Sequence, residues 1–241
     1  MPVIYEPRGK ALEYSPLACN LFTGCSHKCK YCYCPAIFRK TLDDWSNAPH
    51  PRTRILKQLE KDAIKLQGDK REILFSFMTD PYQSEEAAFL TKQALLICEK
   101  YRLIPQILTK AGFRAVSNFD ILLKNNWKFG STIIMRSEEM RAKWEPGAPS
   151  IVSRYEAVKI AHNLGIYTWV SLEPVVDPGE ALKVIEDLKE YVSFWKLGKL
   201  NHFKEIENID WKYYINQAIN LLKGKNYYIK NDLKKYSLNS L

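Results

Sequence analysis

Apolar residues recur along the chain in two alternating patterns, short continuous runs and spacings of three to four residues. The run EILFSFM at residues 72–78 is typical of a strand buried on both faces. Residues 52–66 instead space Ile55, Leu59 and Ile64 as in an amphipathic helix. Strands are predicted at residues 18–23, 72–78, 103–108, 129–135, 166–172 and 192–197. Helices are predicted at residues 52–66, 84–102, 115–124, 153–164, 179–190 and 211–222.

This alternation determines the expected fold class. Strands separated by helices of 10–15 residues form βαβ units and a parallel sheet. A complete eight-unit barrel takes about 250 residues, whereas this chain of 241 residues supplies six units. We therefore predict an α/β fold, a partial (β/α)6 TIM-like barrel, in a single domain over residues 1–241. Ser84 is expected to cap its helix, and Gly165 to end the helix at 153–164.

Composition narrows the class of protein. Apolar residues make up 46% of the chain and charged residues 26%, which is ordinary for a globular domain and argues against general disorder. The longest apolar run, residues 94–98, is too short to cross a bilayer. The first ten residues lack the apolar core of a signal peptide. We expect a cytoplasmic monomer that does not enter a membrane.

The net charge of +9 is placed mainly at the two ends. Residues 1–40 carry six basic and two acidic side chains, and a basic C-terminal extension from about residue 223 carries five lysines and one aspartate. A basic end can bind phosphates or an acidic protein, or it can simply be solvated by water. Lysines of the extension flank Tyr227 and Tyr228, which could stack on bases of a nucleic acid. The alternative is a short strand or helix that covers the barrel edge with both tyrosines packed inside.

Five of the six cysteines lie within residues 19–34. Such clustering without a secretory signal favours metal or redox chemistry over disulfides. Cys25, Cys29 and Cys32 form a C-x3-C-x2-C pattern. A structural zinc site takes four ligands, usually as two pairs, and no second C-x2-C or H-x3-H follows. Three ligands on a [4Fe–4S] cluster would leave one iron open. Cys98, in an apolar helical segment, is expected to be a buried small hydrophobe.

The cysteine spacing, with the aromatic Tyr31 before the third cysteine, resembles the motif of the radical S-adenosylmethionine (SAM) superfamily. The resemblance implies a partial barrel and a [4Fe–4S] cluster on Cys25, Cys29 and Cys32. Its fourth iron would be chelated by the amino and carboxylate groups of S-adenosylmethionine. One electron from a flavodoxin- or ferredoxin-like donor would then give methionine and a 5′-deoxyadenosyl radical that abstracts hydrogen from a substrate. The protein itself supplies binding and orientation.

Further segments resemble the spore photoproduct lyase-like group of this superfamily. In that group N-x-φ-x-G-C-x-H, where φ is an apolar residue, leads into C-x-Y-C-Y, as at residues 20–33 here. Residues 79–83 match its T-D-P-Y-Q turn, and residues 108–110 the end of its third strand. Residues 145–146 with Arg154, and residues 197–201, match later segments. The resemblance covers about residues 20–201, most of the chain.

The resemblance makes eight side chains candidate cofactor contacts. They are Tyr31, Thr79, Asp80, Lys110, Thr132, Arg154, Glu173 and Asn201. Ligands gather at the carboxyl ends of the strands in such folds. Asp80 could instead bond its own turn, and Lys110 could be an exposed lysine. Glu173 and Asn201, at the ends of the last two strands, are candidate substrate or adenine contacts or buried structural residues. Glu145 is expected to stop a helix rather than carry chemistry.

One position departs from spore photoproduct lyase itself. There a cysteine that donates a hydrogen atom lies three residues before the aspartate of the turn, and this chain has Phe77. Neither Phe77 nor Met78 has an S–H bond, so we do not expect thymine-dimer repair by that route. The leading hypothesis is a radical SAM enzyme that acts on a nucleic acid or nucleotide. The alternatives are a protein side chain or small metabolite as substrate, and a non-catalytic binding module stabilised by zinc or another metal.

Overall fold

The structure is a computed structural model that describes residues 2–201, 203 and 208–237. Its strands are β1 (Ile4–Tyr5), β2 (Leu17–Cys19), β3 (Phe22–Thr23), β4 (His50–Pro51), β5 (Glu72–Phe75), β6 (Ile104–Thr109), β7 (Lys128–Thr132), β8 (Thr168–Val175), β9 (Phe194–Lys199) and β10 (Asn226–Ile229). Its α-helices are α1 (Cys34–Ile37), α2 (Leu42–Ser46), α3 (Ile55–Lys65), α4 (Glu85–Lys100), α5 (Phe119–Lys124), α6 (Glu138–Trp144), α7 (Ile151–Asn163), α8 (Pro178–Leu188), α9 (Trp211–Leu221) and α10 (Asn231–Lys234). Two 3-10 helices are η1 (Gly9–Glu13) and η2 (Gly112–Asn118).

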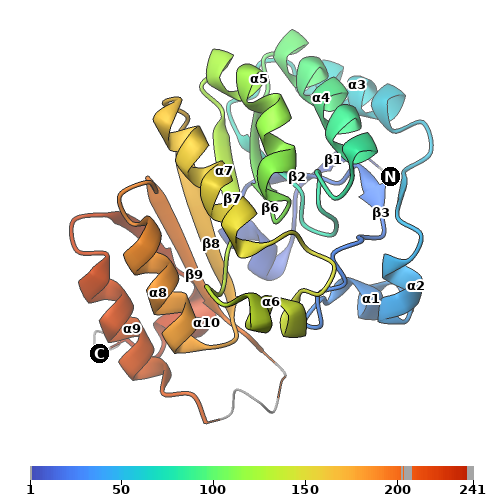
Figure 1. Ribbon diagram of the computed structural model, residues 1–241. Coiled ribbons are helices and arrows are strands. Elements are labelled where there is room, and N and C mark those ends of the chain that lie inside the picture. The colour runs from blue at the N-terminus through green and yellow to red at the C-terminus, as the bar shows by residue number, and fades with distance from the viewer. Residues whose placement is uncertain (1, 202, 204–207, 238–241) are drawn as a thin grey trace.

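The larger sheet has the strand order β1-β2-β5-β6-β7-β8-β9-β10. From β2 to β10 every neighbouring pair is parallel, and β1 joins β2 antiparallel. Helices α4, α5, α7, α8 and α9 lie side by side along the sheet (Figure 1). The six predicted strands are therefore present in the predicted order, and the α/β partial barrel is confirmed. No helix in the described part of the chain combines the length and apolarity needed to cross a bilayer.

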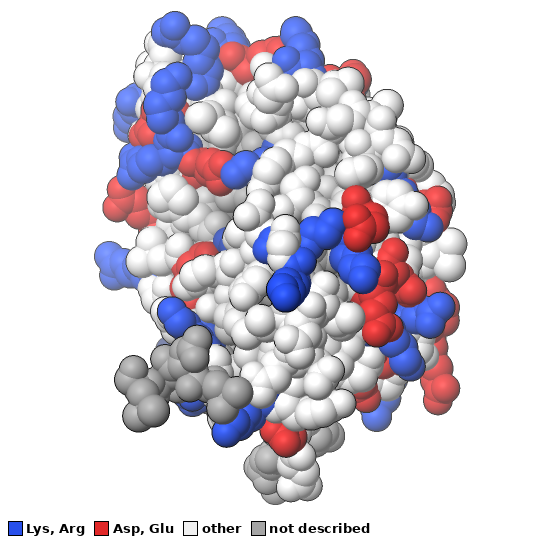
Figure 2. Space-filling view, turned by 90° about the vertical axis from the view of Figure 1, so that its left-hand side faces the viewer, with Lys and Arg blue, Asp and Glu red and all other residues white. Residues whose placement is uncertain are grey.

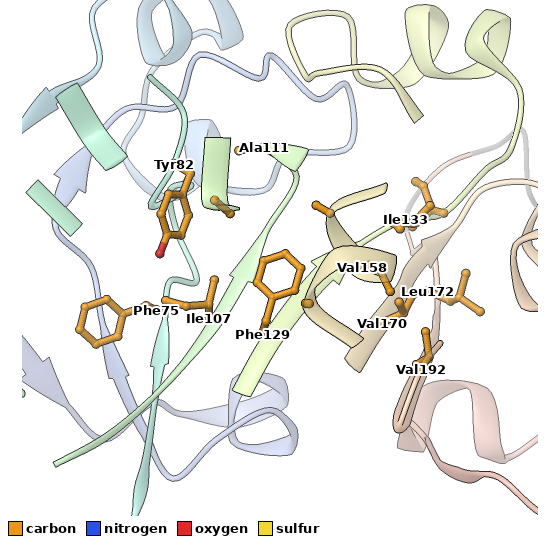
Figure 3. Close-up of a cluster of buried hydrophobic side chains, with 14 of the residues drawn as sticks. Phe75, Tyr82, Ile107, Ala111, Phe129, Ile133, Val158, Val170, Leu172 and Val192 are labelled. Carbon is orange, nitrogen blue, oxygen red and sulfur yellow. The ribbon is translucent and has the colours of Figure 1, made fainter. Parts of the chain in front are cut away.

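Alternate residues of the strands form the main apolar core beneath the helices. Phe75, Ile107, Phe129, Val170 and Leu172, from four neighbouring strands, are fully buried and lie in one band (Figure 3). Burying a side chain of this size contributes about 1.5–3 kcal/mol. Because successive strand residues point to opposite faces, the residues between them face the inside of the barrel.

The inside of the barrel is filled partly by the N-terminal segment that follows β1. The Nζ atom of Lys196 on β9 donates hydrogen bonds of 2.8 Å to the backbone oxygens of Glu13 and Tyr14. The indole of Trp169 occupies the space above Gly130 on β7, where any Cβ would overlap the ring. Hydrogen bonds inside the barrel thereby join a segment near the start of the chain to a strand near its end.

The local signals at helix ends are confirmed. The Ser84 hydroxyl caps α4 by accepting a hydrogen bond from the Ala87 backbone N–H at 3.1 Å. Gly165 has a φ of +84°, a left-handed conformation that glycine adopts without a Cβ penalty, and it follows the end of α7. Cys98 is fully buried in α4, as predicted.

Two regions differ from the sequence prediction. The strand expected at residues 18–23 is divided into β2 and β3 by Asn20, whose Oδ1 accepts 3.0 Å hydrogen bonds from the backbone N–H groups of Phe77 and Met78. The short helices α1, α2 and α6 were not predicted, because four to seven residues are too few to show a helical period.

The basic C-terminal extension contributes a strand to the sheet. Strand β10 pairs parallel with β9, so the prediction of a short strand at the barrel edge is confirmed. The expectation that both tyrosines pack inside is wrong for Tyr227, which is 38% exposed. Tyr227 alternates with Tyr228, which is half-buried and donates a 2.9 Å hydrogen bond to Glu13 Oε2.

Candidate functional site

The three motif cysteines lie on the loop between β3 and α1. Gly24, just before Cys25, has a φ of +83°, and a Cβ there would lie 2.7 Å from the backbone oxygen of Trp45. Only glycine fits this close approach. The backbone N–H of Cys32 donates a 3.0 Å hydrogen bond to the oxygen of Cys29, which curls the loop. Cys29 is buried, and Cys25 and Cys32 are half-buried.

The turn after β5 holds one side of the cysteine loop. The Oε1 atom of Gln83 accepts a 2.8 Å hydrogen bond from the Ser26 backbone N–H, and its Nε2 donates to the Gly24 oxygen at 3.3 Å. The Ser26 hydroxyl in turn donates to the Gln83 backbone oxygen at 3.2 Å. Gln83 is the last residue of the T-D-P-Y-Q segment, so this motif positions the cysteine loop directly.

The connection between α6 and α7 holds the other side. The Lys30 backbone N–H donates to the Trp144 oxygen at 2.9 Å, and the Gly147 N–H donates to the His27 oxygen at 3.0 Å. A Cβ on Gly147 would overlap the Ser26 backbone oxygen. Glycine is therefore required for the two segments to approach, although the sequence pattern did not single it out.

Asp80 joins three segments of the site. Its Oδ1 accepts hydrogen bonds from the Thr109 hydroxyl (2.6 Å) and from the Tyr82 backbone N–H (2.8 Å). Its Oδ2 accepts one from the Lys110 backbone N–H (2.7 Å) and lies 3.0 Å from His27 Nε2. Burial by itself would raise the pKa of Asp80, but His27 and these donors lower it below its ordinary value overall. Asp80 thus bonds its own turn and also links the cysteine loop to the end of β6.

A second buried carboxylate, Glu145, lies beside Tyr31 of the motif. The Arg154 guanidinium forms an ion pair with Glu145, and both side chains are completely buried. The Tyr31 hydroxyl also donates a hydrogen bond to Glu145, and Arg154 Nη1 donates to the Thr132 backbone oxygen at 3.3 Å. Burial would raise the pKa of Glu145, but Arg154 and then Lys110 keep it below its ordinary value. This network connects the motif loop with β7 and α7.

Two sequence expectations need adjustment here. Glu145 ends α6, as predicted, but it is also the buried partner of Arg154, a role that the sequence analysis missed. Lys110 is half-buried, with Nζ 5.7 Å from the centre of the Tyr31 ring. Burial opposes its charge, but nearby Cys29 and Glu145 raise the pKa of Lys110 overall.

The acid–base state of the thiols indicates what the loop could hold. Burial raises the pKa of Cys25, and raises that of Cys29 to about 12, because a bare thiolate would be desolvated. Hydrogen bonding with Cys34 is the main cause that lowers the pKa of Cys32 to about 7. A positively charged partner such as iron would favour the thiolate form of both cysteines.

The three motif thiols do not form a compact site for a single metal ion. Within residues 2–201, 203 and 208–237, no three His, Cys, Asp or Glu side chains converge as ligands of one metal ion. A [4Fe–4S] cluster binds its thiolates through different irons, so its ligands need not meet at a single point. Three thiols on one loop are a donor set that such a cluster can use.

The other predicted residues occupy different surroundings. Thr79 is buried and accepts a hydrogen bond from the Ser76 hydroxyl through its backbone oxygen. Thr132 is buried and contacts Arg154 through its backbone oxygen. Asn201 Nδ2 donates to Asp232 Oδ2 at 3.2 Å, away from the hydrogen bonds of the cysteine loop.

Glu173 belongs to a polar group inside the barrel, formed by Tyr14, Ser171, Glu173, Lys196 and Lys230 and called here the interior polar group. The Tyr14 hydroxyl donates to Glu173 and lies 2.8 Å from Ser171 Oγ. Lys230 Nζ donates to Glu173 Oε1 at 2.7 Å, and Lys230 is buried. Burial is the main cause that lowers the pKa of Lys196 to about 8, and the positive charge of neighbouring Lys230 is the second.

Phe77 lies between the interior polar group and the cysteine loop. Its ring makes an edge-to-face contact with Tyr14, with 5.6 Å between the ring centres. Its backbone oxygen accepts a 3.1 Å hydrogen bond from the hydroxyl of Tyr33, which directly follows Cys32. Phe77 therefore contacts both the interior polar group, through Tyr14, and the residue that follows the third motif cysteine.

Tyr14 and Lys196 also line a cavity of about 240 Å³.

Comparison with known families decides the assignment, because the Radical SAM superfamily is matched over residues 19–192. The chain belongs to the radical SAM superfamily. The matched segment includes the three cysteines, both buried carboxylates of the site and Glu173. Members of this superfamily are enzymes. The resemblance inferred from the C-x3-C-x2-C motif is thereby confirmed.

Individual proteins resemble this radical SAM protein in sequence or in fold. An uncharacterized protein of Methanocaldococcus jannaschii is 28% identical over 233 residues, which cover 88% of this chain and 87% of that protein. Streptococcus suis SuiB bound to S-adenosylmethionine superposes with a TM-score of 0.63 and 14% identity, over 89% of this chain and 50% of SuiB. A spore photoproduct lyase with bound S-adenosylmethionine and dinucleoside spore photoproduct gives a TM-score of 0.60 and 16% identity, over 88% of this chain and 62% of the lyase. The chain therefore spans about half to three-fifths of these structures, and the likeness concerns the fold.

Proposed function

We propose that the protein is a radical SAM enzyme with a [4Fe–4S] cluster on Cys25, Cys29 and Cys32. The observation that carries the proposal is a loop of three thiols held from both sides by hydrogen bonds, with Cys29 buried and Cys25 and Cys32 half-buried. When bound and reduced, such a cluster supplies the electron that splits S-adenosylmethionine into methionine and a 5′-deoxyadenosyl radical, which then takes hydrogen from a substrate.

The chain's own residues would bind and orient the cofactors. We assign the turn at Thr79–Asp80 to the amino group of S-adenosylmethionine and the Lys110 ammonium to its carboxylate. The Asp80 carboxylate supports this assignment, because it accepts a hydrogen bond from the Lys110 backbone N–H. This bond fixes Lys110 at the end of β6, beside the turn. Tyr31, Arg154 and Thr132 are proposed as positioning residues, through the buried bonds that tie the motif loop to β7 and α7.

For the substrate we propose a nucleic acid or a nucleotide, on the basis of the basic chain ends. The support is narrower than the net charge suggests, because Lys225 pairs with Glu190 at 2.9 Å and Lys230 with Glu173 at 2.7 Å. On the face shown in Figure 2, Lys and Arg gather toward the upper left, with acidic side chains among them. DNA or RNA binding that weakens steeply with salt is the expected result. If no binding occurs at low salt, this substrate class is wrong.

A second substrate class, a small charged metabolite or a protein side chain, is favoured by the interior polar group. Glu173, Lys230 and Lys196 place one carboxylate and two amines inside the barrel, where a duplex would not fit but a small ligand could exchange ion-pair partners with them. Transfer of deuterium from labelled candidates into 5′-deoxyadenosine would discriminate between the two classes.

The proposed activity is tested by anaerobic reconstitution with iron and sulfide. We expect a coloured protein that releases 5′-deoxyadenosine from S-adenosylmethionine when dithionite is added. Cys29→Ala should lose both the bound iron and the cleavage, whereas Cys98→Ala, a buried cysteine in α4, should retain both. Cleavage that survives in Cys29→Ala would refute the ligand assignment, and a colourless wild-type protein would favour a binding module instead.

A further inference from the structure

A small apolar surface lies immediately after the third motif cysteine. Tyr33, Ile37 and Phe38 are 53%, 61% and 40% exposed, although large apolar side chains are usually buried. These three residues lie in or next to α1, and Cys34 and Pro35 of that helix are buried and anchor it. Figure 1 shows α1 beside α2 at the lower right of the molecule. A group of exposed apolar side chains of this kind is a candidate interaction site.

The surface is held in a fixed shape. The Phe38 ring stacks on the buried ring of Trp45 in α2, with 4.8 Å between their centres. The Tyr33 hydroxyl is tied to the Phe77 oxygen at 3.1 Å. A partner would therefore meet a largely preorganised face, which reduces the entropy lost on binding.

Basic side chains border this apolar surface. Lys30, Arg39 and Lys40 are exposed, and Lys28 forms a 2.6 Å ion pair with Asp43 of α2. The surface formed by Tyr33, Ile37, Phe38, Lys30, Arg39 and Lys40 is called the α1 face. Charge complementarity between protein surfaces speeds the encounter and selects the partner, so the α1 face suits an acidic protein.

The position of the α1 face indicates which acidic protein would use it. Tyr33 is bonded directly to Cys32, a proposed cluster ligand, so a protein docked on Tyr33 lies one residue from that ligand. We propose that the α1 face is the docking site of an acidic one-electron carrier protein of the flavodoxin type. The inference rests on the proposed function, since that chemistry consumes one electron per cleavage. The reduced carrier would lose one electron, the cluster would gain it, and no bond would form between the two proteins.

The test compares charge-reversed variants of equal net charge. Arg39→Glu with Lys40→Glu alters the α1 face, and Lys57→Glu with Lys61→Glu alters two exposed lysines of α3 as the control. Binding of oxidised flavodoxin is measured by calorimetry, without any turnover. We expect the α1-face variant to bind about tenfold or more weakly, and the control to bind as the wild type does. An equal loss in both variants would show general electrostatics and overturn the proposal.

A second measurement separates docking from chemistry. Formation of 5′-deoxyadenosine is followed with reduced flavodoxin and, separately, with dithionite, which needs no docking surface. The α1-face variant should be slow only with flavodoxin, and Ile37→Ser should behave similarly. Normal rates with flavodoxin would refute the docking site. Failure of the wild type with both reductants would instead refute the proposed function, and the calorimetry would still decide whether the α1 face binds the carrier. If sedimentation shows that Ile37→Ser converts a dimer into a monomer, the α1 face is an interface between two copies and the proposal is wrong.

Discussion

At the scale of single residues, the site is dominated by charges that are buried and paired. Asp80 and Glu145 are both buried, and each carboxylate accepts hydrogen bonds from side chains or backbone N–H groups of other segments. A buried charge is costly unless it is paired and hydrogen-bonded, so removing one partner leaves the other uncompensated. These pairs therefore fix the geometry of the site, and replacing one partner should lower the stability of the folded protein.

Arg154→Met is expected to lower the free energy of unfolding by about 3–5 kcal/mol, because it leaves the Glu145 carboxylate buried without its cation. The variant should also bind less iron, since Glu145 holds Tyr31 of the motif. Urea denaturation and iron analysis measure the two effects. Lys183→Met, which removes an exposed partner of Glu180, is the control and should cost no more than about 1 kcal/mol. Equal costs for the two variants would contradict the assigned role of the buried pair.

At the scale of elements, the cysteine loop has no regular structure of its own and depends on its neighbours. Gln83 from the turn after β5 and the backbone between α6 and α7 hold it through hydrogen bonds of 2.8–3.3 Å. The loop geometry is thus set by segments about 57 and 120 residues away in sequence. Small changes in these neighbours should alter cluster assembly.

Gly147→Ala should impair iron incorporation several-fold, because the added Cβ would overlap the backbone oxygen of Ser26 and push the loop away. Gly179→Ala in α8 is a matched control, since its Cβ would meet only Asp177 Oδ1, at 3.3 Å. Iron per protein after reconstitution is the readout, with thermal unfolding to confirm that both variants fold. Normal iron content in Gly147→Ala would show that the loop does not need this close approach.

At the scale of the whole molecule, the two ends of the chain close the barrel together. Lys196 of β9 binds the N-terminal segment, and Glu13 accepts hydrogen bonds from Tyr228 and from the Asn231 backbone N–H. Barrel closure therefore depends on contacts between residues more than 180 positions apart. One of these contacts is expected to respond to pH.

Burial lowers the pKa of Lys196 from its ordinary value of 10.5 to about 8 in the folded protein. Between these values the unfolded chain binds more protons than the folded one, so the Lys196 contribution to stability should rise with pH from about 8 to 10.5. The difference in unfolding free energy between the wild type and Lys196→Met should change by about 3 kcal/mol across this range. Below pH 8 and above pH 10.5 the difference should be flat. A constant difference from pH 7 to 11 would show that Lys196 stays charged throughout.

The sequence by itself determined the class of fold and predicted which cysteines would hold a cluster. The period of the apolar residues predicted six strands in order, and the C-x3-C-x2-C spacing indicated the superfamily, because both signals are local. Asp80 and Lys110 could also be predicted from the sequence, because they follow strands whose carboxyl ends lie at the same edge of the sheet.

Only the tertiary structure decided which of these residues work together. Glu145 reads locally as a helix stop, yet the folded chain places it against Tyr31 and Arg154. Tyr14 carries no motif, and Glu173 was predicted as a substrate or adenine contact or a buried structural residue; the folded chain places both in the interior polar group with Lys230. Such contacts join segments that are distant in sequence, and their energy comes from burial and pairing created only when the barrel closes. Local patterns therefore determine the elements and the thiol loop, while closure of the barrel selects the partners of each buried charge.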